Sequence, residues 1–326
     1  EEVIKTGNIK NPKNLYTLQT EAGKSYKIKI DFKQVKDETY FNFDLVEGLP
    51  LNISNTLEKL KDIDIIIFAG GISPSLEGEE MNVSATGFKG GDRTDIEFPA
   101  VQRKVLAALK EAGKKVILVN FSGSAMALTP ETKSCDAILQ AWYPGEEGGT
   151  AIVNVLFGDY NPGGKLAVTF PRSVGQIPFA FPFKPGSDSK GFVRVTGTLY
   201  PFGYGLSYTT FAYSDLKIEN PVIGVQGSVK LSCKVKNTGK VAGNEVVQLY
   251  LHDEMSSVTT YVKVLRGFER IHLEPGEEKV IDFVLTPQEL GLWNKDNHFV
   301  VEPGTFAVMV GSSSQDIKLQ GKFEVK

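Results

Sequence analysis

Cysteine and histidine are scarce in this sequence, and their scarcity argues against several kinds of chemistry. The 326 residues include 2 cysteines, Cys135 and Cys233, and 3 histidines. The cysteines lie far apart in the chain, so we expect no disulfide, and no Cys or His pair has zinc-ligand spacing. His252, His272 and His298 all lie in the last third of the sequence, which disfavours a histidine-based catalytic triad. We therefore expect neither a metal nor a cofactor.

Long apolar runs and an excess of one charge are also lacking. No stretch is long and uncharged enough to span a bilayer, and the formal net charge is −3. Basic residues are scattered and form no stripe, so we expect neither a nucleic-acid partner nor a membrane partner. No signal peptide precedes Glu1, which we interpret as the start of a mature or truncated chain.

The first 50 residues show the alternation that is typical of β-strands. Apolar residues occupy every second position over 26–32, and the pattern repeats over 41–45 after a polar break. A turn is predicted at 22–24. Because two or three strands do not form a stable sheet alone, this short β segment either docks onto the rest or ends a larger β module.

Strands and helices alternate from residue 51 to about residue 170. Apolar runs at 65–68, 116–119, 137–142 and 166–170 predict strands, the first of them buried on both faces. Helices are predicted to end near residue 60 and to cover 99–112 and 150–157. Pro99 begins the longest helix and Gly113 follows its end. This order predicts a mainly parallel sheet covered on both faces.

The last third of the sequence has an all-β pattern. Strands are predicted over 229–235, 247–251, 280–285 and 305–310, with turns at 237–239, 274–276 and 302–304. Such spacing favours a β-sandwich of about 100 residues. The preceding stretch, 171–208, is rich in loops and is expected to be functional or interfacial.

Three glutamates follow the first predicted parallel strand. Glu77, Glu79 and Glu80 come after a pair of glycines, and Asp92 and Arg93 follow a Gly-rich loop. The carboxyl ends of parallel strands are where open α/β sheets place their chemistry. Burial beside other carboxylates would give one glutamate the raised pKa that a general acid needs. The alternative, that all three are solvated loop acids, stays open on the residues alone.

Other candidate positions also have two interpretations. Asp92 and Arg93 are expected to form an ion pair that shapes the loop. Trp142 could belong to the core or present its aromatic face to a ligand. The glycines of 145–149 lack the remaining elements of a nucleotide-binding motif. The aromatic residues of 200–208 are expected to pack at a junction between two cores.

Four stretches together resemble the C-terminal half of glycoside hydrolase family 3, the β-glucosidase and β-xylosidase family. They are GGISPSLEGEE (70–80) with GDR (91–93), AWYPGEEGG (141–149), FGDYNPGGKL (157–166) and YPFGYGLSY (200–208). The residues after 211 are similar to a fibronectin type III-like domain, and residues 1–50 look like the end of a PA14-type module. We therefore expect a short N-terminal β segment (1–50), an α/β sandwich domain with a mainly parallel sheet (51–210) and an all-β fibronectin type III-like sandwich (211–326).

The resemblance implies a retaining exo-β-glycosidase that acts on the non-reducing end of β-linked gluco- or xylo-oligosaccharides. In that family an Asp nucleophile lies on a (β/α)8 barrel and a Glu acid/base lies on the α/β sandwich domain. Glu79 matches the acid/base position. The next residue of the family pattern is usually Gly and is Glu80 here, so Glu77 and Glu80 remain possible. Contacts with the oligosaccharide substrate are expected from Glu77, Glu80, Asp92, Arg93 and Trp142.

The resemblance also indicates what this chain does not hold. It contains no barrel, so the expected partner is the N-terminal barrel half of the enzyme, as a separate chain or a missing segment. The family implies periplasmic or secreted placement. The alternative function is a non-catalytic carbohydrate-binding or interaction module that has kept the fold.

Overall fold

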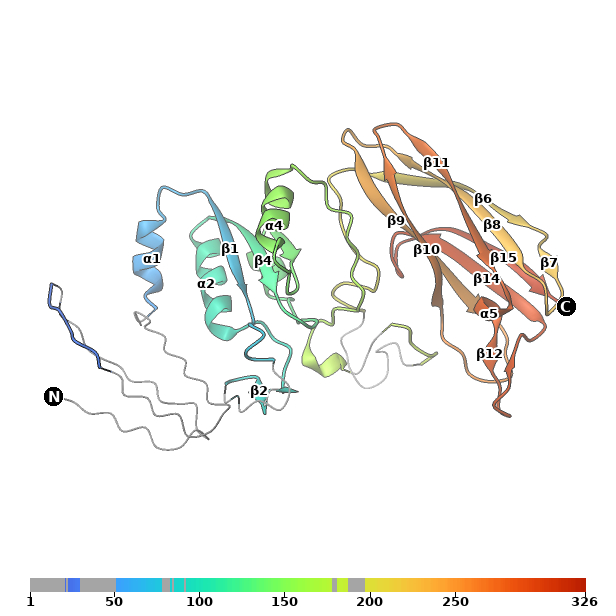
Figure 1. Cartoon of the computed structure of the whole chain (residues 1–326), viewed down its shortest axis with the longest axis horizontal. Helices are drawn as coiled ribbons and strands as arrows, with labels where there is room; N and C mark the ends of the chain where they lie inside the picture. Colours follow the sequence, from blue (N-terminus) through green and yellow to red (C-terminus); the bar gives the residue numbers. More distant parts are fainter. Residues whose placement is uncertain are drawn as a thin grey trace. The chain divides into compact units, whose positions relative to one another are not determined.

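The computed structural model describes residues 21, 23–29, 51–77, 83, 85–90, 92–177, 181–186 and 197–326 (Figure 1). The chain divides into two compact units, Glu1–Leu51 and Asn52–Lys326. In the first unit Gly23 has a φ of 79°, and the Lys24 N–H donates to the Glu21 carbonyl at 3.2 Å, which confirms the turn. Residues 24–29 form no strand. The rest of the strands predicted over 26–32 and 41–45 lies outside the described residues, and the domain boundaries stay predictions.

Three parallel strands form a sheet in the second unit. They are β1 (Ile65–Gly71), β4 (Lys115–Phe121) and β5 (Ala137–Gln140), in the order β1-β4-β5. The helices are α1 (Ile53–Lys59), α2 (Ala100–Glu111), α3 (Glu131–Ser134) and α4 (Gly148–Phe157). Helix α2 lies on one side of the sheet and α4 on the other (Figure 1). The predicted parallel α/β arrangement is confirmed.

Helix α2 covers the sheet because its apolar residues recur at helical spacing. Leu106 and Leu109 are buried against Val116 and Leu118 of β4. Pro99 precedes the helix, where its fixed φ suits a helix start. After the helix the chain turns at Gly113, whose φ of 77° is accessible to glycine without strain.

Strand β1 is buried on one face only, so the prediction of two buried faces is wrong. Ile66 and Phe68 pack on the cluster beneath α2, whereas Ile65 and Ile67 are 55% and 46% exposed. Among the described strands, β1 is an edge strand that pairs with β4 alone. An unbroken apolar run carries no period, and therefore it does not reveal which face is covered.

The strand predicted over 166–170 is not found in the described residues. This segment pairs with the loop at 199–204 through an isolated bridge between Phe170 and Tyr200. The Leu166 N–H donates to the Tyr204 carbonyl at 2.8 Å, and the Phe170 N–H donates to the Tyr200 carbonyl at 2.9 Å. Phe170 is buried, but Val168 is 44% exposed, and the hydrogen-bond partner of this run is a loop and not the parallel sheet.

The C-terminal region is a sandwich of two mainly antiparallel sheets, with strand orders β10-β9-β14-β15-β7 and β11-β8-β6. The strands of the first sheet are β7 (Val222–Ile223), β9 (Gly243–Asp253), β10 (Val264–Leu273), β14 (Gly304–Gly311) and β15 (Ile317–Val325). Those of the second sheet are β6 (Phe211–Glu219), β8 (Val229–Asn237) and β11 (Glu278–Leu285). The four strands predicted from alternation are confirmed as parts of β8, β9, β11 and β14.

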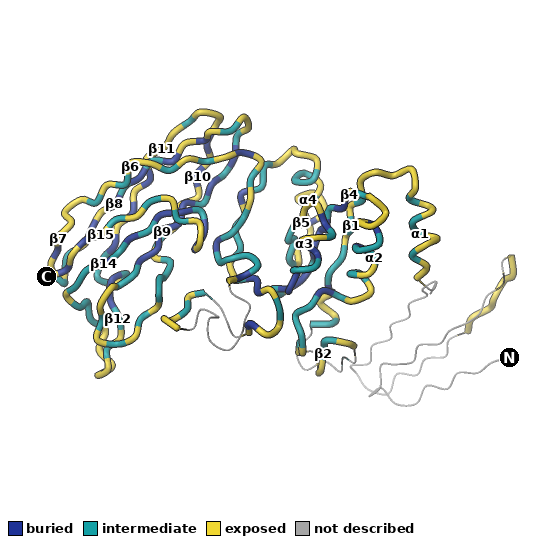
Figure 2. Tube along the Cα trace, turned by 180° about the vertical axis from the view of Figure 1, so that it is seen from behind, coloured by how far each residue is buried: buried dark blue, intermediate teal, exposed yellow. Residues whose placement is uncertain are grey.

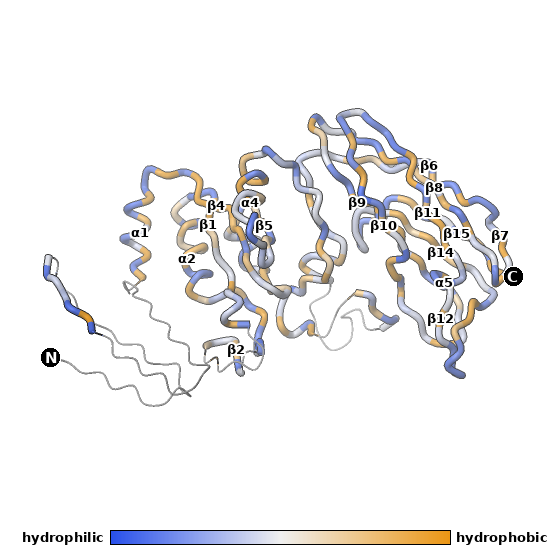
Figure 3. The backbone as a smooth tube through the Cα atoms, in the orientation of Figure 1, coloured by the Kyte–Doolittle hydropathy of each residue, from blue (hydrophilic) through white to orange (hydrophobic). Residues whose placement is uncertain are grey.

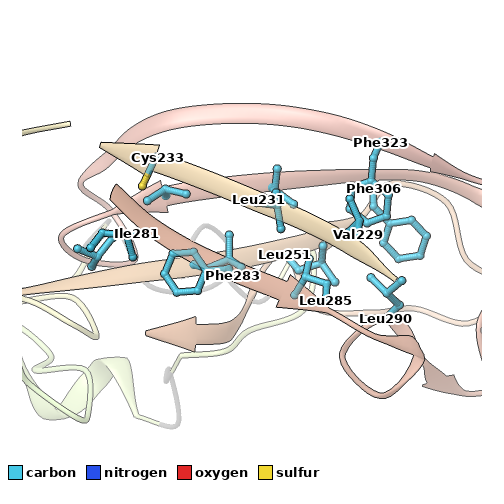
Figure 4. Close-up of a cluster of buried hydrophobic side chains, with 14 of the residues drawn as sticks. Val229, Leu231, Cys233, Leu251, Ile281, Phe283, Leu285, Leu290, Phe306 and Phe323 are labelled. Atoms are coloured by element: carbon cyan, nitrogen blue, oxygen red, sulfur yellow. The ribbon is translucent and has the colours of Figure 1, made fainter. Parts of the chain in front are cut away.

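The sandwich core follows directly from that alternation. Val229, Leu231 and Cys233 on β8 are buried and point into the same cluster as Phe306 and Phe323 from the facing sheet (Figure 4). Buried residues continue along β9 and β14 (Figure 2), and hydrophobic and hydrophilic positions alternate along the strands (Figure 3). On β8 the burial of every second side chain therefore fixes the register of the strand, whereas residues 247–251 of β9 are buried without a break.

Several short elements were not predicted. They are the β2 (Phe88–Lys89) and β3 (Asp92–Arg93) hairpin, the β12 (Leu292–Trp293) and β13 (Phe299–Val300) hairpin, α5 (Pro287–Leu290) and a 3₁₀ turn (Val174–Gln176). Elements of two to four residues carry too little periodicity to be recognised from sequence. None of the helices in the described ranges has the length and apolarity needed to cross a bilayer.

The α/β region and the loop-rich stretch both contact the sandwich through buried polar groups. Lys165 Nζ lies 3.0 Å from Glu245 Oε1, and both side chains are almost fully buried. Gln248 Nε2 donates to the Gly203 carbonyl at 3.1 Å. The Phe202 ring stacks on Phe181 at 4.6 Å between centroids. The 200–208 stretch thus lies at the junction, as predicted.

A second buried ion pair holds α2 against α3. Arg103 Nε donates to Glu131 Oε1 at 2.6 Å and Arg103 Nη2 donates to Glu131 Oε2 at 3.1 Å. The Glu131 side chain is fully buried. Such a bidentate pair is costly to break, because the remaining charge is left without compensation in a region of low polarity.

We expect Arg103→Met to lower the free energy of unfolding by about 3 kcal/mol, since it leaves the Glu131 carboxylate buried and unpaired. Lys110→Met is the matched control. Lys110 pairs with Asp136 at 3.0 Å, but both side chains are 42% exposed, so the cost should stay below about 1 kcal/mol. Urea denaturation of the two variants measures the difference. Equal losses would contradict a special role for the buried pair.

Candidate functional site

The candidate site lies where the three parallel strands end. Strand β1 ends at Gly71, whose φ is 126° and where a Cβ atom would lie 2.0 Å from the Phe121 carbonyl oxygen at the end of β4. The Gln102 side chain of α2 holds this turn, accepting from the Gly71 N–H at 2.7 Å and donating to the Gly71 carbonyl at 2.8 Å. Glycine is therefore required here, and the chain after β1 leaves the sheet in a fixed direction.

The carboxylate of Glu77 accepts hydrogen bonds from residues that follow β4 and β5. Glu77 Oε1 accepts from Ser124 Oγ at 2.7 Å, and Glu77 Oε2 accepts from the Gly123 N–H at 3.0 Å. The Tyr143 hydroxyl, beyond the end of β5, donates to Oε2 at 2.5 Å. Three donors from two loops thus meet on one carboxylate, which ties the ends of all three strands together.

Arg93 supplies the positive charge at this carboxylate. Its Nη1 lies 3.7 Å from Glu77 Oε1 and donates to Ser124 Oγ at 3.0 Å. The guanidinium also lies over the Phe88 ring of the β2–β3 hairpin, 5.9 Å from the centroid. Both ion-pair side chains are mostly buried, 12% and 14% exposed for Arg93 and Glu77. The hairpin is therefore anchored to the sheet edge through Arg93.

The expected Asp92–Arg93 ion pair is not formed among the described residues. Asp92 is exposed, whereas Arg93 faces Glu77 and donates from Nε to the Asp95 carbonyl at 3.1 Å. Adjacent residues in a strand point to opposite faces, so their side chains do not meet. Arg93 does shape the loop, as expected, but its acidic partner is Glu77.

The surroundings of Glu77 keep its carboxyl group ionised. Burial alone would raise the pKa of Glu77, but hydrogen bonds from Tyr143, Ser124 and Gly123 and the charge of Arg93 outweigh it, so the pKa falls below its ordinary value of 4.5. Burial and the neighbouring carboxylate raise the pKa of Tyr143 to about 12, so its hydroxyl stays protonated and donates. Glu77 is thus ionised near neutral pH and is not suited to donate a proton. Because its carboxylate holds the surrounding loops in place, we call it the anchor.

Gly123 makes this close arrangement possible. A Cβ atom at Gly123 would lie 2.7 Å from Tyr143 Cε2 and 2.9 Å from Glu77 Oε2. Neither separation is tolerated, so any side chain at this position would displace Tyr143 or Glu77.

A polar network lies beside the anchor. The Asn120 amide donates to Gln140 Oε1 at 2.6 Å, Gln140 Nε2 donates to Ser122 Oγ at 3.0 Å, and Ser122 Oγ donates to the Ser124 carbonyl at 2.9 Å. The network links the last residues of β4 and β5 to the loop that holds Glu77. Hydrogen bonds of this kind position the loop residues without touching Glu77 directly.

Trp142 has its ring in contact with the core of the α/β region. It packs on the cluster beneath α2, with its ring 5.9 Å from that of Phe170 in an edge-on arrangement. Its φ is 56°, an uncommon value for a residue with a side chain. Core packing and a sugar contact are compatible because the ring is only partly buried. Its role in substrate binding stays a prediction.

Two of the predicted site residues, Glu79 and Glu80, lie outside the described residues. The structure brings together Glu77 and Arg93, leaves Asp92 exposed and places Trp142 on the core. Sequence reasoning missed Ser124, Gly123 and Tyr143. The position of these residues just after two neighbouring parallel strands is the signal that could have identified them. Over the described ranges no cluster of three or more His, Cys, Asp or Glu residues could hold a metal ion.

Comparison with known proteins identifies the class: the chain belongs to glycoside hydrolase family 3. The glycosyl hydrolase family 3 C-terminal domain matches residues 6–208, and the fibronectin type III-like domain matches residues 245–314. The first match contains the Glu77 site, and the second lies within the sandwich.

Named relatives agree with this family. A xylan 1,4-beta-xylosidase of Xylanibacter ruminicola is 46% identical over 305 residues, which cover 93% of this chain and 35% of the relative. A periplasmic beta-glucosidase of Salmonella typhimurium is 42% identical, over 84% of this chain and 36% of the relative. The structure of a β-glucosidase from Erythrobacter marinus matches with a TM-score of 0.78 and 38% identity, over 84% of this chain and 36% of that one. This chain therefore spans little more than one third of the length of these relatives.

We expect Gly123→Ala to destabilise the protein by about 1–3 kcal/mol, because the added methyl group displaces Tyr143 or Glu77. Gly145→Ala is the matched control, since a Cβ at Gly145 meets no atom within 4 Å, and its effect should stay within about 0.5 kcal/mol. Thermal unfolding at pH 7 compares the variants. If Gly123→Ala were as mild as the control, the close packing around Glu77 would be wrong.

Proposed function

We propose that this chain is the C-terminal part of a retaining, exo-acting β-glycosidase, with Glu79 as the general acid/base. Its substrate would be the non-reducing end of β-linked xylo- or gluco-oligosaccharides. The Asp nucleophile would lie on a barrel domain outside this chain. In such a reaction the acid protonates the leaving oxygen while the nucleophile attacks the anomeric carbon, and the two carboxyl groups stand about 5–5.5 Å apart.

The observation that carries the proposal is the environment of Glu77. A retaining glycosidase needs one carboxyl group that holds a proton at working pH. Glu77 is unsuited to that role because three donors and Arg93 lower its pKa. The candidates for the general acid are then the glutamates that follow Glu77 in the chain, Glu79 and Glu80. Chain connectivity limits the distance between the Cα atoms of Glu77 and Glu79 to about 7 Å, so the anchor at Glu77 restricts where Glu79 can reach.

The relatives support the substrate class. The names of the two curated relatives are a xylan 1,4-beta-xylosidase and a periplasmic beta-glucosidase, and a β-glucosidase from Listeria innocua has been solved in complex with glucose at 29% identity and a TM-score of 0.76. We infer a β-linked glucose or xylose unit at the non-reducing end, and export to the periplasm or outside the cell. We also propose that residues 1–50 are the end of a PA14-type module.

Apolar side chains that are exposed in this chain support a binding partner that would cover them. Ile65 and Ile67 on β1 and Val153 and Phe157 on α4 are between 46% and 71% exposed. In soluble proteins, large apolar side chains grouped on a sheet or helix are normally covered by other parts of the protein or by a partner. The N-terminal barrel half of the enzyme, which would account for much of the length that the relatives have beyond this chain, is the partner that we propose for them.

The first test is hydrolysis of aryl β-xyloside and aryl β-glucoside by the chain alone and after mixing with the N-terminal portion of the Xylanibacter relative. We expect no turnover alone and turnover on mixing, with the ratio of rates reporting the preferred sugar. Activity of the chain alone would place a nucleophile within it and contradict the split site. Sugar binding without turnover in either condition would favour a non-catalytic carbohydrate-binding module.

Leaving-group dependence then tests Glu79 in the active mixture. Glu79→Gln should slow a phenyl glycoside by about 10²–10⁴-fold but a dinitrophenyl glycoside only slightly, because a good leaving group departs without a proton. Glu80→Gln, the same exchange one residue later, is the comparison variant; because Glu80 is an expected substrate contact, it should slow both glycosides by the same factor, without dependence on the leaving group. If Glu80→Gln shows the leaving-group signature, the acid is Glu80. Equal losses on both substrates would remove Glu79 from the acid role.

A further inference from the structure

A small cavity lies at the junction between the loop-rich stretch and the sandwich, away from Glu77. Its volume is about 70 Å³ and its lining includes Thr169, Phe181, Thr198, Phe202, Lys263 and Ser314. This space is large enough for a water molecule or a small inorganic ion such as a halide.

Lys263 places its ammonium group at this cavity, and no described carboxylate forms an ion pair with it. Its Nζ donates to the Ser314 carbonyl at 2.6 Å, which uses one of the three N–H groups of an ammonium. No carboxylate in the described part of the chain pairs with it, and Asp316, two residues after Ser314, pairs instead with Lys318 at 2.7 Å. Burial lowers the pKa of Lys263. A half-buried ammonium of this kind is costly unless a negative charge compensates it.

Two hydroxyl groups add hydrogen-bond donors to the same cavity. Thr198 is 7% exposed, and its Oγ1 has no hydrogen-bond partner among the described residues. Thr169 Oγ1 accepts from the Phe181 N–H at 3.2 Å, which leaves its own hydrogen available to donate. The polar residues that line the cavity are thus Lys263, Thr169 and Thr198 together with Ser314 and Gln315, and the rings of Phe181 and Phe202 form an apolar part of its wall.

We propose that this cavity binds a small inorganic anion of halide size, held by Lys263 with Thr198 and Thr169. Three donors, a net positive charge and an apolar wall favour an anion over a neutral water molecule. The donors come from both sides of the junction, because Thr198 belongs to the loop-rich stretch, Thr169 lies just before that stretch, and Lys263 immediately precedes β10. The bound anion therefore links that stretch to the sandwich and stabilises the folded chain. This inference does not depend on the proposed glycosidase activity.

The test is thermal unfolding of the chain while chloride replaces gluconate, a bulky organic anion, at constant ionic strength. We expect a saturable rise in Tm of about 3 °C for the unmodified protein. Lys263→Met should abolish the rise and Thr198→Val, which keeps the charge, should weaken it. Lys230→Met, which removes an exposed lysine on β8, is the matched control and should leave the rise unchanged.

Bromide provides a second readout that does not depend on how well the variants fold. Crystals of the unmodified chain soaked in bromide should show an anomalous scattering peak beside Lys263 Nζ. A Tm that does not saturate with chloride, an equal rise in Lys263→Met, or no bromide peak at Lys263 would each overturn the proposal and leave water as the occupant.

Discussion

The Glu77 carboxylate is the constraint on which the edge of the parallel sheet depends. Its partners Gly123 and Ser124 follow β4, Tyr143 follows β5, and Arg93 lies on the β2–β3 hairpin. One ionised group therefore fixes the ends of three strands and a hairpin relative to each other. Because the donors outweigh the effect of burial, the anchor keeps its charge. The stability that it contributes is present above pH 4.5 and is lost as the pH falls through the lower pKa of the folded state.

The surroundings of Glu77 suit one of the two roles that a carboxyl group can take at such a sheet edge. A carboxylate that is surrounded by donors positions its loop, while a proton donor needs an environment that disfavours charge. The junction with the sandwich is held in a comparable way, by the Lys165–Glu245 pair and by Gln248. Buried polar contacts thus fix the position of the site loop and of the sandwich, and apolar packing builds the two cores.

Much of the fold could be predicted from the sequence, and the failures have physical causes. The strand β8 was predicted because alternate residues are buried, and α2 because its apolar spacing and its terminal Pro99 and Gly113 agree. The exposed face of β1 could not be predicted, because all residues of an apolar run look alike. The anchor could not be recognised either, since its donors lie 46 to 66 residues after Glu77 in the chain. Only the fold brings them together.

Carbon-13 NMR titration of the glutamate side-chain carboxyl groups tests this account most directly, with Glu77→Gln used to assign the Glu77 signal. The account predicts that Glu77 titrates below 4.5, and that Tyr143→Phe moves its pKa upward because a donor is lost. A Glu77 carboxyl group that titrates above 4.5 would contradict the account. Glu77 would then be a candidate proton donor, and the anchor role would have to be abandoned.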